Sequence, residues 1–312
     1  MKKDKKDKKE NRKPRKDNKD LPVIFILDMD RTLIGVSDMM FDCVEVVEFA
    51  RSCCASKKIT NLPCPKKVTF QEMFQPEFIR PGVKDMLDGI KQMYPTSEIF
   101  IYSAGSQKYV AECIALVENN TGVTFNRPLF SREQCVGTQV GYKKSIVTHL
   151  PQMMNVLTNK YPGLKDPVNQ EKVTQYRLAF IDDKDVIWDM TDKWIRCPDY
   201  LYKPIIDITK YVDRRMMQHP LLRAFNAKGV LRVFFEPDEG EITDDDRNLL
   251  YHVFMADCYG SNLPNNRNAL NDKFCLHLLN AIKPYKGLVK PFTAENIGNI
   301  SKYIEEQIEL DK

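Results

Sequence analysis

The stretch Leu21-Pro-Val-Ile-Phe-Ile-Leu-Asp28-Met-Asp30-Arg-Thr32 decides the fold that we expect for this chain. It begins with a short, continuous apolar run that is rich in β-branched residues, and the acidic pair Asp28 and Asp30 ends that run. Such a run indicates a strand buried on both faces, as in a parallel sheet. The two carboxylates would then lie at the carboxyl end of the strand, where ligands bind in open α/β sheets.

Two further apolar segments end in polar residues in the same way. Residues 98–102 precede Ser103-Ala-Gly-Ser106, and residues 177–181 precede Asp182-Asp183. Between the strands, apolar residues recur at helical spacing over 83–93 and again from Ser106 to about Gly122. Strands that alternate with amphipathic helices predict an α/β fold with a doubly wound parallel sheet, in which the strand at 177–181 lies beside the first.

Residues 39–74 form an insertion after the first strand, for which we expect no regular element but a small lid beside the first loop. Four of its residues, Cys43, Cys53, Cys54 and Cys64, could supply zinc thiolates, although their spacing fits no common zinc ribbon or finger.

The chain divides by composition into three parts: a basic tail over 1–20, an α/β domain over 21–210 and a mostly helical extension over 211–312. Helices are expected from Thr243, over 274–282 and over 293–310. The acids of Thr243-Asp-Asp-Asp246 suit the first turn of a helix better than a metal cluster. The apolar stripes of the extension are either simple core or the contact face for a protein partner.

The tail carries eleven Lys or Arg against five Asp or Glu, while the whole chain has a formal net charge of +4. A basic arm on a near-neutral body predicts either a solubilising tail or weak contact with nucleic acid or an acidic partner. Nine cysteines without CxxC spacing and the lack of a signal peptide favour the nucleus or cytoplasm over secretion. With no apolar run of about 20 residues, we expect no membrane span.

The acidic strand ends fit phosphoryl transfer through an aspartate, which needs a nucleophilic carboxylate, a proton donor for the leaving oxygen, and cations. Asp28 is the candidate nucleophile, and Asp30 is the candidate general acid and later base. Asp182-Asp183 can add oxygen ligands for Mg²⁺, which prefers a few carboxylates with water and phosphate oxygen. The predicted metal ligands are Asp28, Asp30 and Asp182.

Three other side chains suit phosphate binding. Thr32 and Ser103 can donate hydrogen bonds to phosphoryl oxygens, and the helix that starts after Ser103 offers backbone amides. Either Lys143 or Lys144 supplies the remaining positive charge; from the residues alone the two stay open.

DMDRT, YSAGS, a lysine and IDD, in this order on strand ends, resemble the four motifs of the haloacid dehalogenase (HAD) superfamily. The resemblance implies that Asp28 is the nucleophile, that Ser103 is the hydroxyl of the second motif, and that Asp182 is the metal-binding acid of the fourth. An aspartate at position 30 implies a phosphatase or phosphotransferase. The Tyr-x spacing before the third-motif lysine favours Lys144.

Three more blocks resemble the FCP/SCP group of RNA polymerase II C-terminal domain phosphatases: residues 78–83 (FIRPGV), 130–135 (FSREQC) and 181–188 (IDDKDVIW). The likeness spans roughly 21–206 and implies a phosphoserine or phosphothreonine protein as substrate. Arg31 departs from the family, which often has Glu or Gln there, and the segment 151–175 is long.

These patterns predict a Mg²⁺-dependent protein serine/threonine phosphatase, acting on a polymerase-tail-like protein or on a basic DNA-packaging phosphoprotein in a compact viral relative of the group. One alternative is a nucleic-acid 3′-phosphatase, aided by the basic arm. The other is a phosphopeptide-binding scaffold on the same fold, which would require no turnover.

Overall fold

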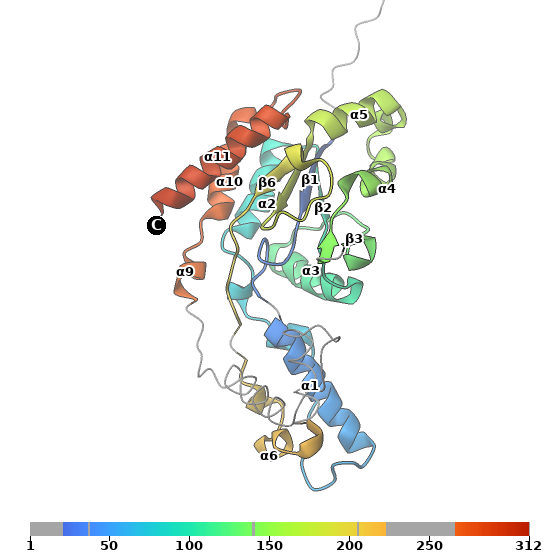
Figure 1. Cartoon of the computed structure of the whole chain (residues 1–312), viewed down its shortest axis with the longest axis vertical. Coiled ribbons are helices and arrows are strands. Elements are labelled where there is room, and N and C mark those ends of the chain that lie inside the picture. Colours follow the sequence, from blue (N-terminus) through green and yellow to red (C-terminus); the bar gives the residue numbers. More distant parts are fainter. Residues whose placement is uncertain (1–20, 37, 139–140, 205, 223–265, 312) are drawn as a thin grey trace, which may run out of the picture.

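The computed structural model describes residues 21–36, 38–138, 141–204, 206–222 and 266–311 (Figure 1). The predicted helix from Thr243 and the basic tail lie outside these residues. A four-stranded parallel sheet forms the centre, in the order β2-β1-β5-β6. Its strands are β1 (Val23–Leu27), β2 (Ser97–Ile101), β5 (Leu178–Asp182) and β6 (Trp194–Arg196).

Strand β1 pairs with β2 on one side and with β5 on the other, so that Phe25 lies opposite both Ile99 and Ala179. After β1 the chain therefore forms β2 on one side of that strand, and it later forms β5 and β6 on the other side. This reversal confirms the doubly wound sheet and places the ends of β1, β2 and β5 together, at the point where such sheets bind ligands.

Alternate residues of the buried strands feed two apolar layers. Phe25 and Leu27 face one layer, whereas Ile24 and Ile26 face the other. The first layer is covered by α2 (Val83–Met93), α3 (Gln107–Thr121), α10 (Phe274–Ile282) and α11 (Ala294–Leu310), and the second by α4 (Ile146–Thr158) and α5 (Pro167–Tyr176) (Figure 1). Continuous apolar strands are explained by this burial on both faces.

The predicted helices over 83–93, 274–282 and 293–310 are confirmed, as is the end of α3. Gly122 stops α3 with a left-handed φ of 71°, a conformation that glycine adopts without steric cost. Thr293 begins α11 by accepting a hydrogen bond from the Asn296 amide at 3.2 Å.

The insertion is more regular than the sequence indicated, because α1 (Asp38–Ala55) fills its first half. Apolar residues are spread around most of this helix, so its sequence shows no single apolar stripe. Its three valines and three cysteines are also weaker helix formers than Ala or Leu. Among the described residues, the only group of three or more potential metal ligands is made of aspartates, so the four cysteines of the insertion form no such group. The eight described cysteines are free thiols.

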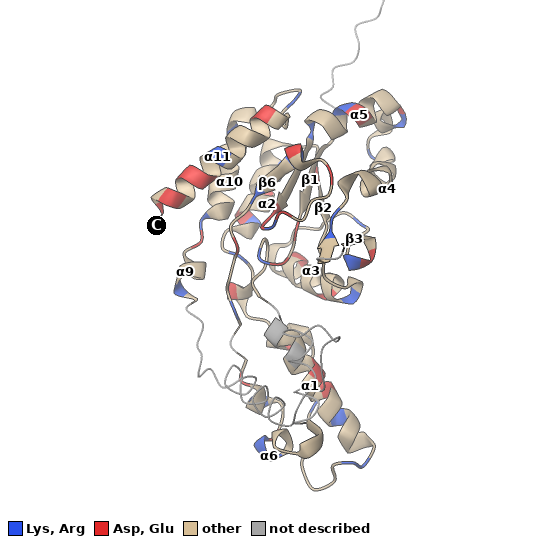
Figure 2. Ribbon diagram, in the orientation of Figure 1, with Lys and Arg blue, Asp and Glu red and all other residues tan. Residues whose placement is uncertain are grey.

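Helices α10 and α11 pack into the first apolar layer. Phe292, between them, is fully buried, and its ring lies 5.3 Å from that of Phe25 on β1. The apolar stripes of these helices therefore belong to the core, while acidic residues mark the exposed last turns of α11 (Figure 2).

The remaining elements are short. The strands β3 (Val136–Thr138) and β4 (Gly141–Lys143) form an antiparallel pair. The helical turns are η2 (Phe70–Met73), η3 (Pro76–Phe78), η4 (Arg132–Gln134), η5 (Pro162–Lys165), η6 (Thr191–Lys193), η7 (Ile208–Lys210), α6 (Arg214–Met217), α9 (Arg267–Leu270) and η8 (Lys283–Tyr285). No helix in the described part of the chain has the length and apolar character needed to cross a membrane.

We predict that Phe292→Ala lowers the free energy of unfolding by about 3–5 kcal/mol, because it empties a fully buried ring site against β1. Urea unfolding followed by circular dichroism measures the change. Leu310→Ala is the matched control: Leu310 is 78% exposed, so its truncation should cost less than about 0.5 kcal/mol. Equal effects of the two changes would contradict the packing of the C-terminal helices on the sheet.

Candidate active site

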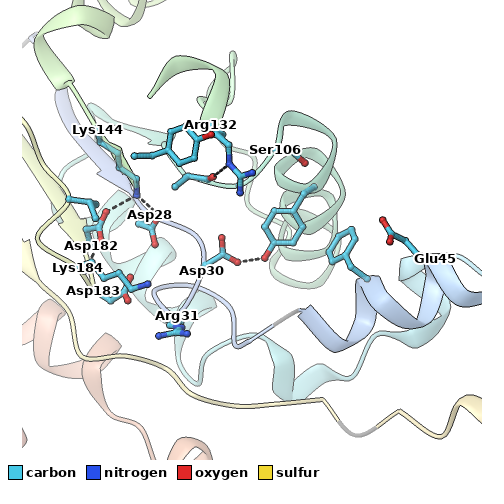
Figure 3. Close-up of a pocket in the computed structure, with 16 residues that line it drawn as sticks. Asp28, Asp30, Arg31, Glu45, Ser106, Arg132, Lys144, Asp182, Asp183 and Lys184 are labelled. Atoms are coloured by element: carbon cyan, nitrogen blue, oxygen red, sulfur yellow. Dashed lines mark hydrogen bonds and ion pairs between the residues drawn. The ribbon is translucent and has the colours of Figure 1, made fainter. Parts of the chain in front are cut away.

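A cavity of about 650 Å³ opens at the carboxyl ends of β1 and β5 (Figure 3). Its floor carries the strand-end acids, and its walls come from α1, the start of α3, and the loops before α4 and after β5. The lining residues are Asp28, Asp30, Arg31, Phe41, Glu45, Ala104, Gly105, Ser106, Tyr109, Arg132, Tyr142, Lys144, Asp182, Asp183, Lys184 and Val186.

Lys144 is the lysine that reaches the strand-end acids. Its Nζ lies 2.5 Å from Asp28 Oδ1 and 2.7 Å from Asp182 Oδ2, and the side chain is almost wholly buried. The neighbouring Lys143 instead donates to the Asp185 carbonyl at 2.8 Å. Burial alone would lower the pKa of Lys144, but the two carboxylates outweigh it and raise that pKa, so the lysine stays charged.

Three carboxylates, from Asp28, Asp182 and Asp183, offer oxygens that all lie within 4.8 Å of one another. Burial raises the pKa of Asp28 above its usual range. The pKa of Asp182 is raised to about 6 by burial against the opposing charge of Lys144. Burial and the neighbouring Asp199, Asp28 and Asp182 carboxyls raise the pKa of Asp183 to about 8. One ammonium is thus too little positive charge for this cluster.

The cluster fits a divalent cation. Asp183 Oδ2 is buried without a hydrogen-bond partner among the described residues, and such an orphaned oxygen is costly unless a donor or cation meets it. Carboxylate oxygens at one sheet edge are the ligands that Mg²⁺ prefers. The carboxylates that converge are those of Asp28, Asp182 and Asp183. Asp30, which the sequence analysis included among the metal ligands, is not part of this group.

The Asp30 carboxylate lies across the cavity from Lys144 (Figure 3). One of its oxygens accepts a hydrogen bond from the Tyr109 hydroxyl, and the other accepts one from Ser103 Oγ at 3.2 Å. Ser103 is fully buried and also accepts the Gly105 amide at 3.0 Å. In this arrangement Ser103 orients Asp30 instead of lining the cavity.

Thr32 also lies below the cavity floor. Its hydroxyl donates to Asp183 Oδ1 at a long 3.5 Å, and the residue is 1% exposed. The structure therefore does not bring Thr32 to the cavity surface. Arg31, between the two acids and Thr32, has a left-handed φ of 59°, which costs a non-glycine residue on the order of 1 kcal/mol and points to a constrained loop.

Several residues near the site were not expected from the sequence. Tyr109 lies on α3, and nothing in the sequence of that helix distinguishes it as a site residue. Arg132 donates to the Ala104 carbonyl at 2.8 Å and stacks on Tyr142. Glu133 accepts the Gln107 amide at 3.2 Å, so one of the backbone amides expected to bind phosphate already has a partner. Of these residues, only Arg132 and Glu133 could have been noticed from the sequence, because they lie in the block 130–135, which resembles a family motif.

Two aspartates just after β1, a lysine held between Asp28 and Asp182, and an acid cluster at the end of β5, on a doubly wound sheet, form the arrangement expected of a phosphatase of the HAD type. The model of the family described as NLI interacting factor-like phosphatase matches residues 23–204, more than half of the chain. The chain belongs to this family.

Two solved structures are similar to this chain: the fission yeast RNA polymerase II CTD phosphatase Fcp1, in a variant bound to beryllium fluoride, and Fcp1, described as an essential RNA polymerase II CTD phosphatase. Each is 16% identical, and each match covers 82% of this chain and 68% of the other. The TM-scores, 0.29 and 0.30, are too low for the likeness to support a conclusion. A search of curated proteins found no match.

We predict that Asp183→Asn stabilises the metal-free protein at pH 8 by about 1–3 kcal/mol, because it removes a buried charge with an orphaned oxygen. The pKa of Asp183 rises from an ordinary 3.8 to about 8 on folding. This carboxyl therefore contributes stability that is fully present below about pH 4 and is lost as the pH rises through 8. Thermal unfolding in a chelator at pH 5 and pH 8 measures the effect.

The advantage of the variant should shrink at pH 5, and added Mg²⁺ should stabilise the wild type more than the variant. Asp185→Asn, at an exposed neighbour, is the control and should change neither result. A variant that is less stable than the wild type in chelator at pH 8 would contradict this account of the cluster.

Proposed function

We propose that the chain is a Mg²⁺-dependent protein serine/threonine phosphatase that works through an aspartyl-phosphate on Asp28. The observation that carries the proposal is the placement of Lys144 between Asp28 and Asp182, with the Asp30 carboxylate across the same cavity. A charged lysine and a carboxylate at the end of a buried strand suit a site that receives a dianionic phosphoryl group.

In the first step, a carboxylate oxygen of Asp28 attacks phosphorus, and a new O–P bond forms while the bond from phosphorus to the serine or threonine oxygen breaks. The Asp30 carboxyl gives its proton to that leaving oxygen. In the second step, a water molecule attacks the phosphorus of the aspartyl-phosphate and gives its proton to Asp30. The bond between phosphorus and Asp28 breaks, so inorganic phosphate leaves and both carboxyls return to their first state.

The chain's own residues prepare both steps. Lys144 offsets negative charge at Asp28, which lets an anionic phosphoryl group approach it. Tyr109 and Ser103 fix the Asp30 carboxylate from two sides, so that its free rotation does not compete with proton transfer. Asp28, Asp182 and Asp183 are the residues that would hold Mg²⁺, which when bound supplies further positive charge beside the transferring group.

A second cavity of about 680 Å³ supports a peptide substrate. It lies between α1, residues 67–71 and α3, and it shares Phe41, Glu45, Ser106 and Tyr109 with the active-site cavity. Glutamates outnumber lysines among its lining residues by three to two, through Glu45, Glu48 and Glu112. Glu48 pairs with Arg51 at 3.0 Å and Glu112 with Lys108 at 4.0 Å, so this lining does not select between an acidic phosphoprotein and a basic one, such as a DNA-packaging protein. A polymerase-tail-like substrate is the other protein class that we keep.

We predict that Asp28→Asn lowers turnover of p-nitrophenyl phosphate and of a phosphoserine peptide by about 10³-fold or more, because the amide lacks the nucleophilic charge. Phosphate release with and without Mg²⁺ measures the loss, beside Asp185→Asn as a matched control that should keep full activity. Equal activity of Asp28→Asn and wild type would exclude the aspartyl-phosphate route.

The same assay separates the alternatives when it includes a 3′-phosphorylated oligonucleotide at two salt concentrations. Steeply salt-dependent release from the oligonucleotide alone would support a nucleic-acid 3′-phosphatase, in which the basic tail contributes by counterion release. Binding of the phosphopeptide without release of phosphate would support a scaffold.

The two adjacent lysines give a sharper comparison. We predict that Lys144→Met lowers kcat by about 100-fold or more, because it removes the charge between Asp28 and Asp182. Lys143→Met should leave kcat within about twofold of wild type, since that side chain contacts only a backbone carbonyl among the interactions described. A larger loss from Lys143→Met than from Lys144→Met would reverse the assignment.

A further inference from the structure

We propose that Arg80 and Asp272 are positioning residues for the catalytic loop, which is the segment Asp28–Thr32. Through these two residues, the C-terminal helices hold the loop in its active form. The kinetic part of this inference rests on the proposed function. Its structural part does not, because it concerns the loop geometry alone.

Arg80 lies at the centre of the arrangement. Its Nε donates to Asp272 Oδ1 and its Nη2 to Asp272 Oδ2, both at 2.8 Å, which makes a bidentate ion pair. The same guanidinium contacts the backbone of the catalytic loop, because Nη1 donates to the Thr32 carbonyl at 3.2 Å and to the Arg31 carbonyl at 3.4 Å. It thus joins the loop directly to Asp272, which lies two residues before α10.

The guanidinium also reaches the segment after β6. Its Nη2 donates to the Pro198 carbonyl at 2.9 Å, and its Nη1 lies 2.9 Å from Cys197 Sγ. Phe274, in the first turn of α10, packs with its ring centroid 4.6 Å from the guanidinium carbon. Three parts of the chain that are distant in sequence therefore converge on one side chain.

Because this ion pair is buried, each of its charges depends on the other. The Arg80 side chain is fully buried, and that of Asp272 is 14% exposed. A buried guanidinium needs a carboxylate partner, and removing the partner leaves an uncompensated charge that draws water or moves the side chain. Because Arg80 also bonds to the loop carbonyls, such a movement would release them.

The backbone of the catalytic loop is constrained, so it depends on contacts such as those of Arg80. Arg31 adopts a left-handed backbone between Asp30 and Thr32, and its carbonyl accepts a second hydrogen bond from the Tyr200 amide at 2.8 Å. The Arg80 amide donates to the Leu33 carbonyl at 2.9 Å, so the Arg80 backbone holds the next part of the loop. A constrained conformation persists only where its surroundings determine it, and here the surroundings include Asp272.

The test compares Asp272→Asn with Asp311→Asn. Asp311 binds His277 at 2.6 Å and Lys273 at 2.7 Å, so its change loosens the contact between α10 and α11 without touching Arg80. Hydrogen exchange of residues 29–35, followed by mass spectrometry, reports on the loop, and kcat and KM for p-nitrophenyl phosphate are measured well below both unfolding temperatures. Asp272→Glu tests rescue by a carboxylate and replaces the Asn variant if that variant does not fold.

We expect faster exchange of residues 29–35 and a kcat lower by about 10- to 100-fold in Asp272→Asn, with KM changed less. Asp311→Asn should leave both readouts as in the wild type, and Asp272→Glu should restore part of the loss. Equal loop exchange in the two Asn variants would overturn the inference, as would an equal kcat. If the wild type releases no phosphate while the exchange results hold, the proposed function fails and the positioning role of the ion pair stands.

Discussion

The interaction on which the site depends is the contact of Lys144 with two carboxylates at the ends of adjacent strands. Parallel pairing of β1 with β5 brings Asp28 and Asp182 to the same edge of the sheet, which crowds negative charge in a buried place. One buried ammonium offsets part of that charge, and burial still raises the pKa values of Asp28, Asp182 and Asp183. Binding of a cation is the natural way to complete the balance.

Around this charge cluster, the rest of the fold supplies rigidity. Alternate residues of β1 enter two separate apolar layers, so the strand that carries Asp28 is held from both faces. The acid proposed to move protons is fixed differently, by the hydroxyl of Ser103, in the loop after β2, and that of Tyr109, in the first turn of α3. The proposed nucleophile thus depends on the sheet, whereas the proposed proton carrier depends on the loop after β2 and on the helix that follows it.

Local pattern was enough to predict the three main strands, the order that places β5 beside β1, and the acids at the ends of β1 and β5. It was not enough for α1, whose valines and cysteines show no single apolar face. The choice between Lys143 and Lys144 depends on which of two adjacent side chains points inward, which only the packing decides. Tyr109 was not predicted, because its role arises from the tertiary approach of α3 to Asp30.

The ion pair between Arg80 and Asp272 joins residues that lie 192 positions apart. During synthesis on the ribosome, every side chain proposed for chemistry is made before Asp272. At that stage Arg80, which contacts the catalytic loop, lacks its carboxylate partner. Formation of the native loop must therefore wait for the C-terminal helices, and such late, long-range closure is typical of slow steps in folding. The order of translation thus delays the competent site until the segment that carries Asp272 has been made.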